Sequence, residues 1–430
     1  MVIKDKNTRE VSKNTTILPF KRFSLDTTED PKKIFNFPFL INSETISVIK
    51  NDGRVMFIIR GPPYTKKTKL SNMLRETYPA SPFCCMVKLT ENYETKDDSS
   101  NLKHETLEQT RQDCTKAVLE ACRSKKSTII IQNSHMRKKE IQPWLDLAAE
   151  FDYIVIMAAT MYKFDITPEA LIREDGLHVS YLQKRFNEWE DVPPLFTAWF
   201  ISPNDSEKLR SITFEKLRVL NKIKLIRSWF ETDVANYFQP RENMCSLAGY
   251  SANADAMKKY YFSNDVQQRY GKCYPIFILG FLITKTDVIG VAKLNENGIS
   301  LVMDDLIKRN GNKAMREIPK SILQYGKTTK FPFGADLPPK SSGFLYRKGE
   351  KVSAKLCRPI HVAQKGFDVF NLEKVSEQFQ EGLQLMSDKD GNLNEKYFFK
   401  SRIYKLSDDL WFTNVMEKFR FSTIFTGFYV

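Results

Sequence analysis

The stretch RVMFIIRGPPYTKKTKLSNML, residues 54–74, decides the fold of the first half of the chain. It opens with a short apolar run that is typical of a buried strand, and it ends in the spaced apolar residues of an amphipathic helix. The loop between them starts at Gly61 and closes with Lys67 and Thr68. In a phosphate-binding loop, or P-loop, the lysine reaches the outer phosphates and the hydroxyl reaches Mg²⁺. The stretch therefore predicts a nucleotide-phosphate site between a strand and a helix.

The loop departs from the P-loop pattern G-x-x-x-x-G-K-[ST] at positions where the backbone favours glycine. Tyr64 and Lys66 stand at two such positions. If Lys66 needs a left-handed backbone, its side chain costs about 1 kcal/mol or more. Pro62 and Pro63 also remove two N–H groups that could bind phosphate. Two interpretations stay open, a phosphate site or a lysine-rich helix start that matches the pattern by chance.

Similar apolar runs follow along the chain and predict a parallel sheet. They do not alternate with polar residues, which is typical of strands that are buried on both faces. Segments with helical periodicity separate them, and this alternation favours an α/β fold. The expected strands lie at residues 55–59, 84–89, 127–133 and 153–160, the expected helices at 107–125 and 140–151, and an expected polar loop at 92–106.

A change of pattern near residue 244 predicts a second, α+β domain. The chain has 430 residues, which is more than one ordinary core supports. Residues 168–229 are expected to be mainly helical, with residues 206–230 as one basic helix that links two domains. Later strands are expected at residues 276–283, 288–294, 360–362 and 421–428, and later helices at 251–268 and 372–386. The expected units are a flexible basic arm over 1–35, a P-loop domain over 36–235 and an α+β domain over 236–430.

The charge balance favours an acidic partner. The chain has 66 lysines and arginines against 52 aspartates and glutamates, a net charge of +14 at pH 7. Such a surplus favours RNA, nucleotides or weak contact with an anionic membrane. A basic surface that only keeps the protein in solution is the alternative, because charge governs association rather than fold.

Cysteine usage and apolar runs predict a cytoplasmic protein. The seven cysteines contain no C-x-x-C pair and no zinc spacing, so we expect reduced thiols. The longest apolar run, residues 274–283, is about half of the roughly 20 residues that a membrane-spanning helix needs. The C-terminal FTGFYV holds no cysteine for a prenyl anchor. No metal site is expected.

Four segments together carry a family resemblance. They are FNFPFL, MFIIRGPPYTKKT, PPLFTAWFISPNDSEKLR and STIFTGFYV. In order and interval they resemble the 2′,3′-cyclic-nucleotide 3′-phosphodiesterases of myelin, over residues 35–430. The resemblance implies an N-terminal domain like polynucleotide kinase and a C-terminal domain like the two-histidine phosphoesterases. It also implies that Gly61, Lys67 and Thr68 bind nucleotide phosphates. No cofactor is expected to be required. The phosphate-binding loop could hold ATP or GTP together with Mg²⁺.

The kinase-like half lacks acidic residues that the family carries. The resemblance implies an acidic residue after the second strand, where the nearest candidates are Thr90 and Glu91. It implies paired aspartates after the third strand, where this chain has Gln132 and Asn133. Neutral amides neither accept a proton nor offer charge to Mg²⁺ as carboxylates do. Kinase activity is therefore not expected, whereas nucleotide binding through Lys67 is possible without these carboxylates.

The phosphoesterase-like half lacks both His-x-Thr motifs that the resemblance implies. One imidazole would act as general base and the other as general acid, while the threonines hold the phosphate. The degenerate positions are Cys245 and Leu247 in the first motif and Ile360 and Val362 in the second. A shift by one residue would put His361 and Ala363 at the second motif instead. No such shift helps the first motif, because no histidine lies between His178 and His361.

Three functions follow from these patterns. The first is a catalytically degenerate relative of the family that binds RNA, nucleotide or a protein partner. The second is an active 2′,3′-cyclic-nucleotide 3′-phosphodiesterase that yields 2′-nucleotides and works with altered residues. The third is a scaffold that responds to nucleotide. His361 is read as a strand-edge residue, with a binding role or a lone acid–base role as alternatives.

Overall fold

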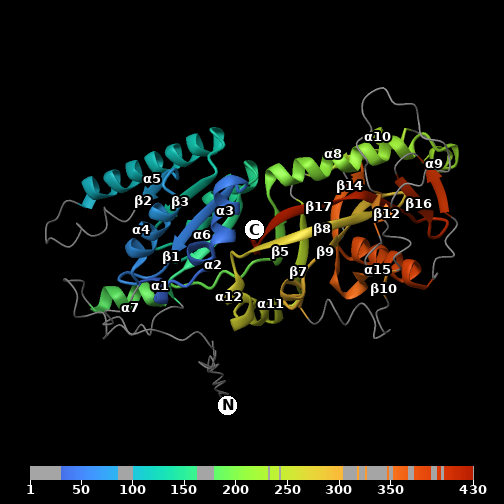
Figure 1. Ribbon diagram of the computed structural model, residues 1–430. Coiled ribbons are helices and arrows are strands. Elements are labelled where there is room, and N and C mark those ends of the chain that lie inside the picture. Colours follow the sequence, from blue (N-terminus) through green and yellow to red (C-terminus); the bar gives the residue numbers. More distant parts are fainter. Residues whose placement is uncertain are drawn as a thin grey trace, which may run out of the picture.

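The computed structural model describes the chain as two sheets that form the two halves of an elongated molecule (Figure 1). The fold is mixed α/β, with a parallel sheet in one half and a larger antiparallel sheet in the other. The residues described are 31–85, 100–161, 179–230, 233–241, 244–303, 317–318, 325–326, 346–347, 352–366, 372–388, 395–398 and 401–429. Most of the expected basic arm therefore lies outside the described residues.

The predicted parallel sheet is confirmed. Its four strands run in the order β2-β3-β1-β4 and are all parallel. They are β1 (Val55–Arg60), β2 (Phe83–Cys85), β3 (Thr128–Gln132) and β4 (Ile154–Ala159). Every residue of β1 is buried, because helices cover both faces of a sheet of this kind.

Alternate residues of β1 face different helices. Met56 and Ile58 pack with α5 (Ser100–Arg123) and α6 (Lys138–Glu150) in one core cluster. Phe57 packs in the other direction, with α4 (Lys67–Thr77) and Phe39. The expected loop at 92–106 is wrong in its last part, since α5 begins at Ser100; residues 86–99 lie outside the described residues.

Short helices precede the parallel sheet and one follows it. They are α1 (Pro31–Ile34), α2 (Pro38–Ile41), α3 (Ser43–Asn51) and α7 (Val179–Asn187). The segment FNFPFL stacks Phe37 on Phe39 with ring centres 4.9 Å apart, and Phe39 meets Phe57 at 5.3 Å. These rings attach the start of the described chain to β1.

The antiparallel sheet has nine strands and forms the second half. Seven follow the order β15-β16-β17-β8-β9-β14-β6, and β5 joins β17 to β7. They are β5 (Phe196–Ile201), β6 (Phe238–Pro240), β7 (Cys245–Tyr250), β8 (Cys273–Ile283), β9 (Asp287–Lys293), β14 (Cys357–Lys365), β15 (Glu395–Phe398), β16 (Ser401–Lys405) and β17 (Trp411–Phe428). Two small two-stranded sheets pair β10 (Glu317–Ile318) with β13 (Val352–Ser353), and β11 (Tyr325–Gly326) with β12 (Tyr346–Arg347).

The region expected to be mainly helical contains a strand. β5 pairs Trp199 with Phe425 of β17 and with Ser246 of β7, so the antiparallel sheet extends across the expected domain boundary at 235/236. Its six residues, FTAWFI, are too few to show a strand period beside the helical pattern that follows.

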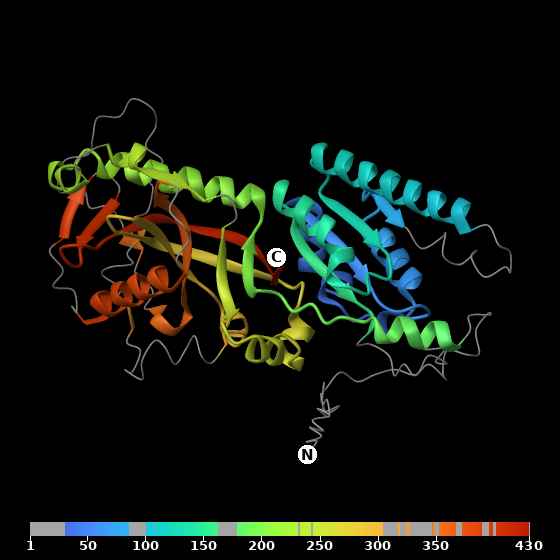
Figure 2. The ribbon, with the colours of Figure 1, turned by 180° about the vertical axis from the view of Figure 1, so that it is seen from behind.

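The expected long helix at 206–230 is two helices. The first is α8 (Pro203–Leu220). Its N-cap residue is Ser202, whose hydroxyl accepts a hydrogen bond from the Asp205 N–H at 3.2 Å. This helix ends before a turn, and α9 (Lys224–Phe230) follows. α8 runs along the antiparallel sheet rather than linking two domains (Figure 2). The helix expected at 251–268 is likewise divided, into α11 (Ala254–Tyr261) and α12 (Asn264–Arg269).

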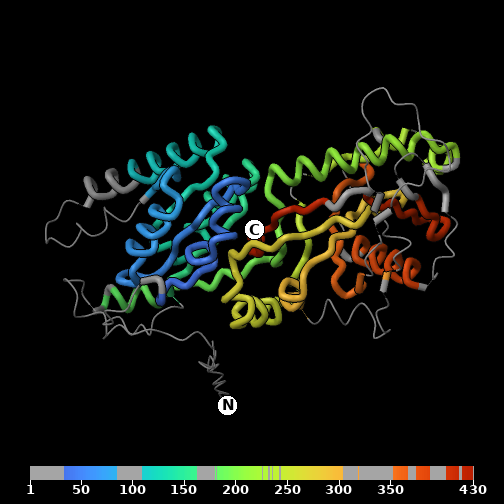
Figure 3. The backbone as a smooth tube through the Cα atoms, in the orientation of Figure 1, coloured from blue at the N-terminus to red at the C-terminus, as the bar shows by residue number. Residues whose placement is uncertain are grey.

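Side chains of the second half cover the edge of the parallel sheet. β4 is an edge strand. The Met157 N–H of β4 donates to Tyr270 Oη at 3.1 Å, and Thr426 Oγ1 donates to the Val155 carbonyl at 2.7 Å. β17 carries Thr426 toward this edge and ends between the sheets (Figure 3). Polar side chains thus satisfy edge groups that would otherwise pair with another strand.

The expectation that all cysteines are free thiols is wrong for one pair. Cys84 of β2 and Cys114 of α5 form a disulfide, with their Cα atoms 5.8 Å apart. Spacing in the sequence could not show this, because 30 residues separate two positions that the α/β fold brings together. Among the described residues, no helix is both long enough and apolar enough to cross a membrane.

Candidate functional site

The loop after β1, residues 61–68, is named here the phosphate loop, and its backbone has the shape that glycine favours. Tyr64 has φ 61° and Lys66 has φ 56°, both left-handed. The expectation that these positions favour glycine is therefore confirmed. Gly61 has a different constraint: a Cβ there would overlap the Thr160 hydroxyl and lie 2.7 Å from Thr65 Oγ1. Only glycine fits at position 61.

The phosphate loop closes on Lys67. The Lys67 side chain is buried, and its Nζ donates to the Pro62 carbonyl at 2.6 Å. Thr65 Oγ1 donates to the same carbonyl at 2.9 Å and meets Thr160 Oγ1 at 2.5 Å. These bonds connect Pro62, near the start of the phosphate loop, with Thr65 and Lys67 near its end. Gly61 and Lys67, with Thr68 in the first turn of α4, thus lie at the carboxyl edge of β1.

The end of β3 contacts the phosphate loop through an amide. Gln132 Nε2 donates to Thr68 Oγ1 at 3.3 Å. The Gln132 side chain is 1% exposed, and its Oε1 has no hydrogen-bond partner within the described ranges. Asn133 Oδ1 accepts from the Ser134 N–H at 2.7 Å. Thr90 and Glu91, the candidates for an acidic residue, lie outside the described residues.

These donors fit a nucleotide phosphate better than Mg²⁺. Mg²⁺ in proteins is usually held by one or two carboxylates, whereas Thr68 and Gln132 offer a hydroxyl and a neutral amide. No cluster of three metal-ligating side chains occurs in the part of the chain that the structure describes. Lys67 supplies a cation for phosphate without a carboxylate nearby in residues 61–68.

A buried histidine that sequence reasoning missed supports the phosphate loop. His135 Nδ1 lies 3.0 Å from the Ile59 carbonyl, and Trp144 Nε1 donates to His135 Nε2 at 3.1 Å. Nε2 accepts, so Nδ1 carries the proton and the ring is neutral. Burial lowers the pKa of His135 to about 4, and the charges of Arg60 and Lys67 act in the same direction. Both ring nitrogens are occupied, so this histidine holds the backbone and is no acid–base catalyst.

The two strands that carry the degenerate motifs lie next to each other. Within the described residues β7 contacts β14 without pairing with it, since the hydrogen-bonded neighbours of β14 are β9 and β6. Alternate residues of each strand share one face, named here the motif face. The motif face contains Cys245 and Leu247 from β7 and Ile360 and Val362 from β14, all packed into one core cluster. None of the four side chains is an imidazole or a hydroxyl.

His361 points away from the motif face. It lies between Ile360 and Val362 in β14, and neighbouring residues of a strand face opposite ways. His361 Nε2 is 3.0 Å from Asp287 Oδ1, and Asp287 Oδ2 is 3.5 Å from Nζ of Lys374 in α15 (Leu372–Asp388). The His361 side chain thus faces Asp287, beside Lys374 of α15.

Asp287 is ionised in this arrangement. Burial alone would raise the pKa of Asp287, but hydrogen bonds from His361 and Thr286 and the nearby charges of His361 and Lys374 outweigh burial and lower it. His361 thus belongs to a buried network behind β14 that joins the strand to α15.

Cys245 and Arg358 are titratable groups in the strands that carry the motif positions. Burial raises the pKa of the Cys245 thiol to about 12, so the thiol is protonated and a poor nucleophile. Arg358 shares its strand face with Ile360 and is 7% exposed. Burial lowers the pKa of Arg358 to about 10, which leaves it charged. Its Nε has no hydrogen-bond partner among the residues that the structure describes.

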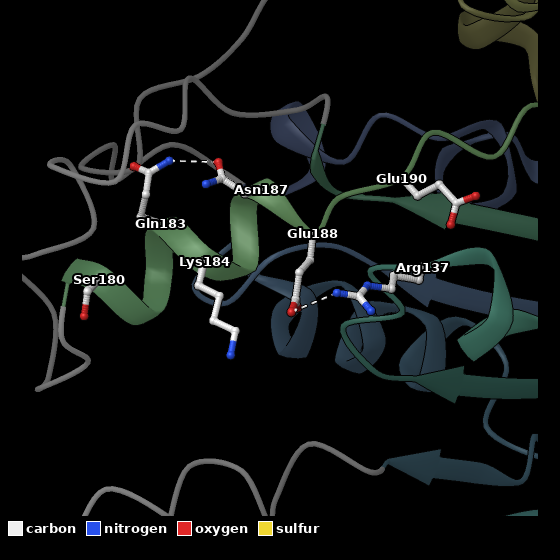
Figure 4. A pocket seen from close by; sticks show the side chains of 7 residues that line it. All are labelled: Arg137, Ser180, Gln183, Lys184, Asn187, Glu188 and Glu190. Atoms are coloured by element: carbon white, nitrogen blue, oxygen red, sulfur yellow. Dashed lines mark hydrogen bonds and ion pairs between the residues drawn. The ribbon is translucent and has the colours of Figure 1, made fainter.

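A surface cavity of about 590 Å³ lies beside α7 (Figure 4). Its lining residues are Arg137, Ser180, Gln183, Lys184, Asn187, Glu188 and Glu190. Arg137 is paired with Glu188 at 3.1 Å, and Gln183 donates to Asn187 at 3.0 Å. The cavity thus carries both signs of charge, with Arg137 and Lys184 beside Glu188 and Glu190.

The geometry thus gives two candidate regions, a phosphate loop with a buried lysine and a motif face without catalytic groups. No protein-family model and no curated protein matches the chain, so the resemblance to the myelin phosphodiesterases stays a prediction.

Proposed function

We propose that the protein binds the phosphates of a nucleotide at the phosphate loop and does not hydrolyse 2′,3′-cyclic nucleotides. The observation that carries the proposal is the left-handed backbone at Tyr64 and Lys66. Each such residue costs about 1–2 kcal/mol when it is not glycine. Strain of this kind persists where the surrounding structure requires it, and it is concentrated at ligand sites.

The charges around the loop favour an anionic ligand. Lys66, Lys67 and Lys69 are consecutive or nearly so, and residues 61–68 include no carboxylate. Lys67 Nζ donates to the Pro62 carbonyl at 2.6 Å, and a phosphate oxygen could accept from the same ammonium group. The loop also opens the 11-residue helix α4, whose amino end favours negative charge.

Binding without hydrolysis follows from the chemistry of the motif face. General acid–base cleavage of a cyclic phosphate needs one group that accepts a proton and another that donates one. Cys245 and Ile360 do neither near neutral pH, since the thiol is protonated and the other side chain is aliphatic. Leu247 and Val362 replace the hydroxyls that would hold the phosphate.

Calorimetric titration with ATP, with and without Mg²⁺, tests the binding half of the proposal. Lys67→Ala is expected to weaken binding at least about 10-fold, because a charge-assisted phosphate contact is lost. Lys69→Ala is the matched control: Lys69 is exposed, lies two residues further along the same helix, and loses the same charge. Equal affinities for the wild type, Lys67→Ala and Lys69→Ala would contradict the proposal.

An active phosphodiesterase is the second candidate, and the His361–Asp287 pair is the observation that favours it. A carboxylate that orients an imidazole is a common feature of general bases. The test is turnover of 2′,3′-cyclic AMP by purified protein. We expect none. Turnover that His361→Ala abolishes would replace the present proposal with an enzyme that uses this pair.

A further inference from the structure

A groove between α8 and β6 has the composition of a nucleic-acid surface. The cavity is about 480 Å³ and is lined on one side by Arg210, Phe214 and Arg218 of α8. These residues are spaced by four, so they form one stripe along the helix, cation then ring then cation. The other side is formed by α10 (Val234–Tyr237) and β6, with Asn236, Gln239 and Pro240 exposed. None of the described residues that line this cavity is acidic.

The two arginines of the groove keep hydrogen-bonding capacity. Arg210 Nη2 donates to the Arg241 carbonyl at 3.1 Å, while Arg210 Nε is buried with no hydrogen-bond partner in the described part of the chain. Arg218 is exposed and lies two turns further along α8. A guanidinium has five N–H donors, so a phosphate at the groove would find donors that the protein itself does not use.

Beyond the groove, α8, α9 and the turn between them expose more cations than carboxylates, and one of the cations, Lys208, is paired with Asp205 at 3.0 Å. The exposed charged side chains of α8, α9 and the turn between them are Lys208, Arg218, Lys222, Lys224 and Arg227 against Glu207 and Glu215. Such an excess attracts a polyanion along its length rather than a single small anion.

We propose that the α8 groove binds a single-stranded RNA, with Arg210 and Arg218 on phosphates and Phe214 against a base. Aromatic rings between cations suit unpaired bases, because every base has a face that stacks. The exposed amides of Asn236 and Gln239 can bond base edges. A lipid surface fits less well: among the described residues, the exposed large apolar side chains are Ile41 and Leu195, and neither lines the groove. The groove is separate from the phosphate loop, so this proposal goes beyond the nucleotide site.

Fluorescence anisotropy with a labelled single-stranded RNA of about 10 nucleotides tests the groove, a length within the span of known single-strand sites. Arg218→Ala is expected to weaken binding about 5- to 10-fold and to lower the slope of log affinity against log salt by about 0.7, the loss of one phosphate contact. Arg227→Ala on α9 is the matched control, an exposed arginine outside the groove with the same change of charge. It should change affinity less than about 2-fold.

Phe214→Leu adds a test of stacking and is expected to weaken binding about 5-fold. Phe214 also packs against the core, so thermal melting must first show that this variant is folded, whereas Arg218→Ala changes only the surface. Equal losses for Arg218→Ala and Arg227→Ala would overturn the proposal, since they would indicate diffuse charge. Binding to phosphatidylserine vesicles that needs Arg218, without any effect of Arg218→Ala on RNA, would also overturn it. Lys67→Ala should leave RNA affinity unchanged, so failure here and failure of the nucleotide site give different results.

Discussion

The phosphate loop and the motif face differ in different ways from the patterns that the resemblance predicts. The phosphate loop keeps its backbone although Tyr64 and Lys66 stand where glycine is favoured. The motif face keeps its two adjacent strands although Cys245 and Ile360 stand where histidine is implied. A backbone shape tolerates such a change at a cost of about 1–2 kcal/mol per residue. Proton transfer has no such tolerance, because an aliphatic side chain cannot exchange a proton at any cost.

The strands of the motif face should differ sharply in what they tolerate. Ile360 and Val362 are fully buried, whereas Cys245 and Leu247 are partly exposed. Ile360→His with Val362→Thr should lower the free energy of unfolding by about 3–5 kcal/mol, because polar groups enter an apolar core. Cys245→His with Leu247→Thr should cost about 1 kcal/mol. Urea unfolding measures both.

Equal losses of unfolding free energy for the two β14 substitutions and the two β7 substitutions would contradict this prediction. A variant with all four substitutions that also hydrolysed 2′,3′-cyclic AMP would show that the motif face is open and lacks only its side chains. In that case the four side chains at these positions, and not the arrangement of the strands, would be what prevents hydrolysis.

Acid should affect the phosphate-loop half first. The folded-state pKa of His135 is lowered to about 4 from 6.5, so the unfolded chain takes up its proton first as pH falls. Stability from this group is fully present above pH 6.5 and is lost between pH 6.5 and 4, about 3 kcal/mol in total. His135→Gln should be less stable at pH 7 and should show a flatter profile over this range. Parallel pH profiles for both proteins would contradict the assignment.

The parallel sheet was predictable from sequence because its signal is local. Runs such as VMFII and TIII are apolar on consecutive positions, and only a strand buried on both faces needs that pattern. The phosphate loop was located for the same reason, since all of its groups lie within residues 61–68. β5 was missed because a six-residue strand beside an 18-residue helix leaves a weak period.

Groups that act through distant partners were not predictable. His135 depends on Ile59 and Trp144, and nothing in the sequence around His135 marks it as buried. The direction in which His361 points was open too, because a one-residue shift of alignment reverses the face of every residue in a strand. The pairing of Asp287 with His361 settles the direction, and that pairing joins residues 74 positions apart.

The network behind β14 should lose its effect at lower pH than His135. The pKa of Asp287 is lowered in the folded protein, so its stabilisation is present above the ordinary carboxyl value of about 3.9 and is lost as pH falls below that value. At pH 7, Asp287→Asn should lower the free energy of unfolding by about 1.5–3 kcal/mol, the range for hydrogen bonds to charged groups. The difference from wild type should shrink below about pH 4. A difference that stays the same between pH 7 and pH 3 would contradict the role of the Asp287 carboxylate.

The smallest effect is the most direct test of strain in the phosphate loop, and it should be a gain. Lys66 is left-handed at φ 56°, so Lys66→Gly should raise the free energy of unfolding by up to about 1 kcal/mol. Lys69→Gly is the control: the same replacement inside α4, where the backbone is helical, should lower it by about 1 kcal/mol. The two variants remove the same charge at positions with different backbone conformations, so opposite signs in urea unfolding would indicate strain at position 66. Two losses of similar size would mean that position 66 gains nothing from glycine, and the loop would then be a lysine-rich helix start with no stored strain for a ligand site to explain.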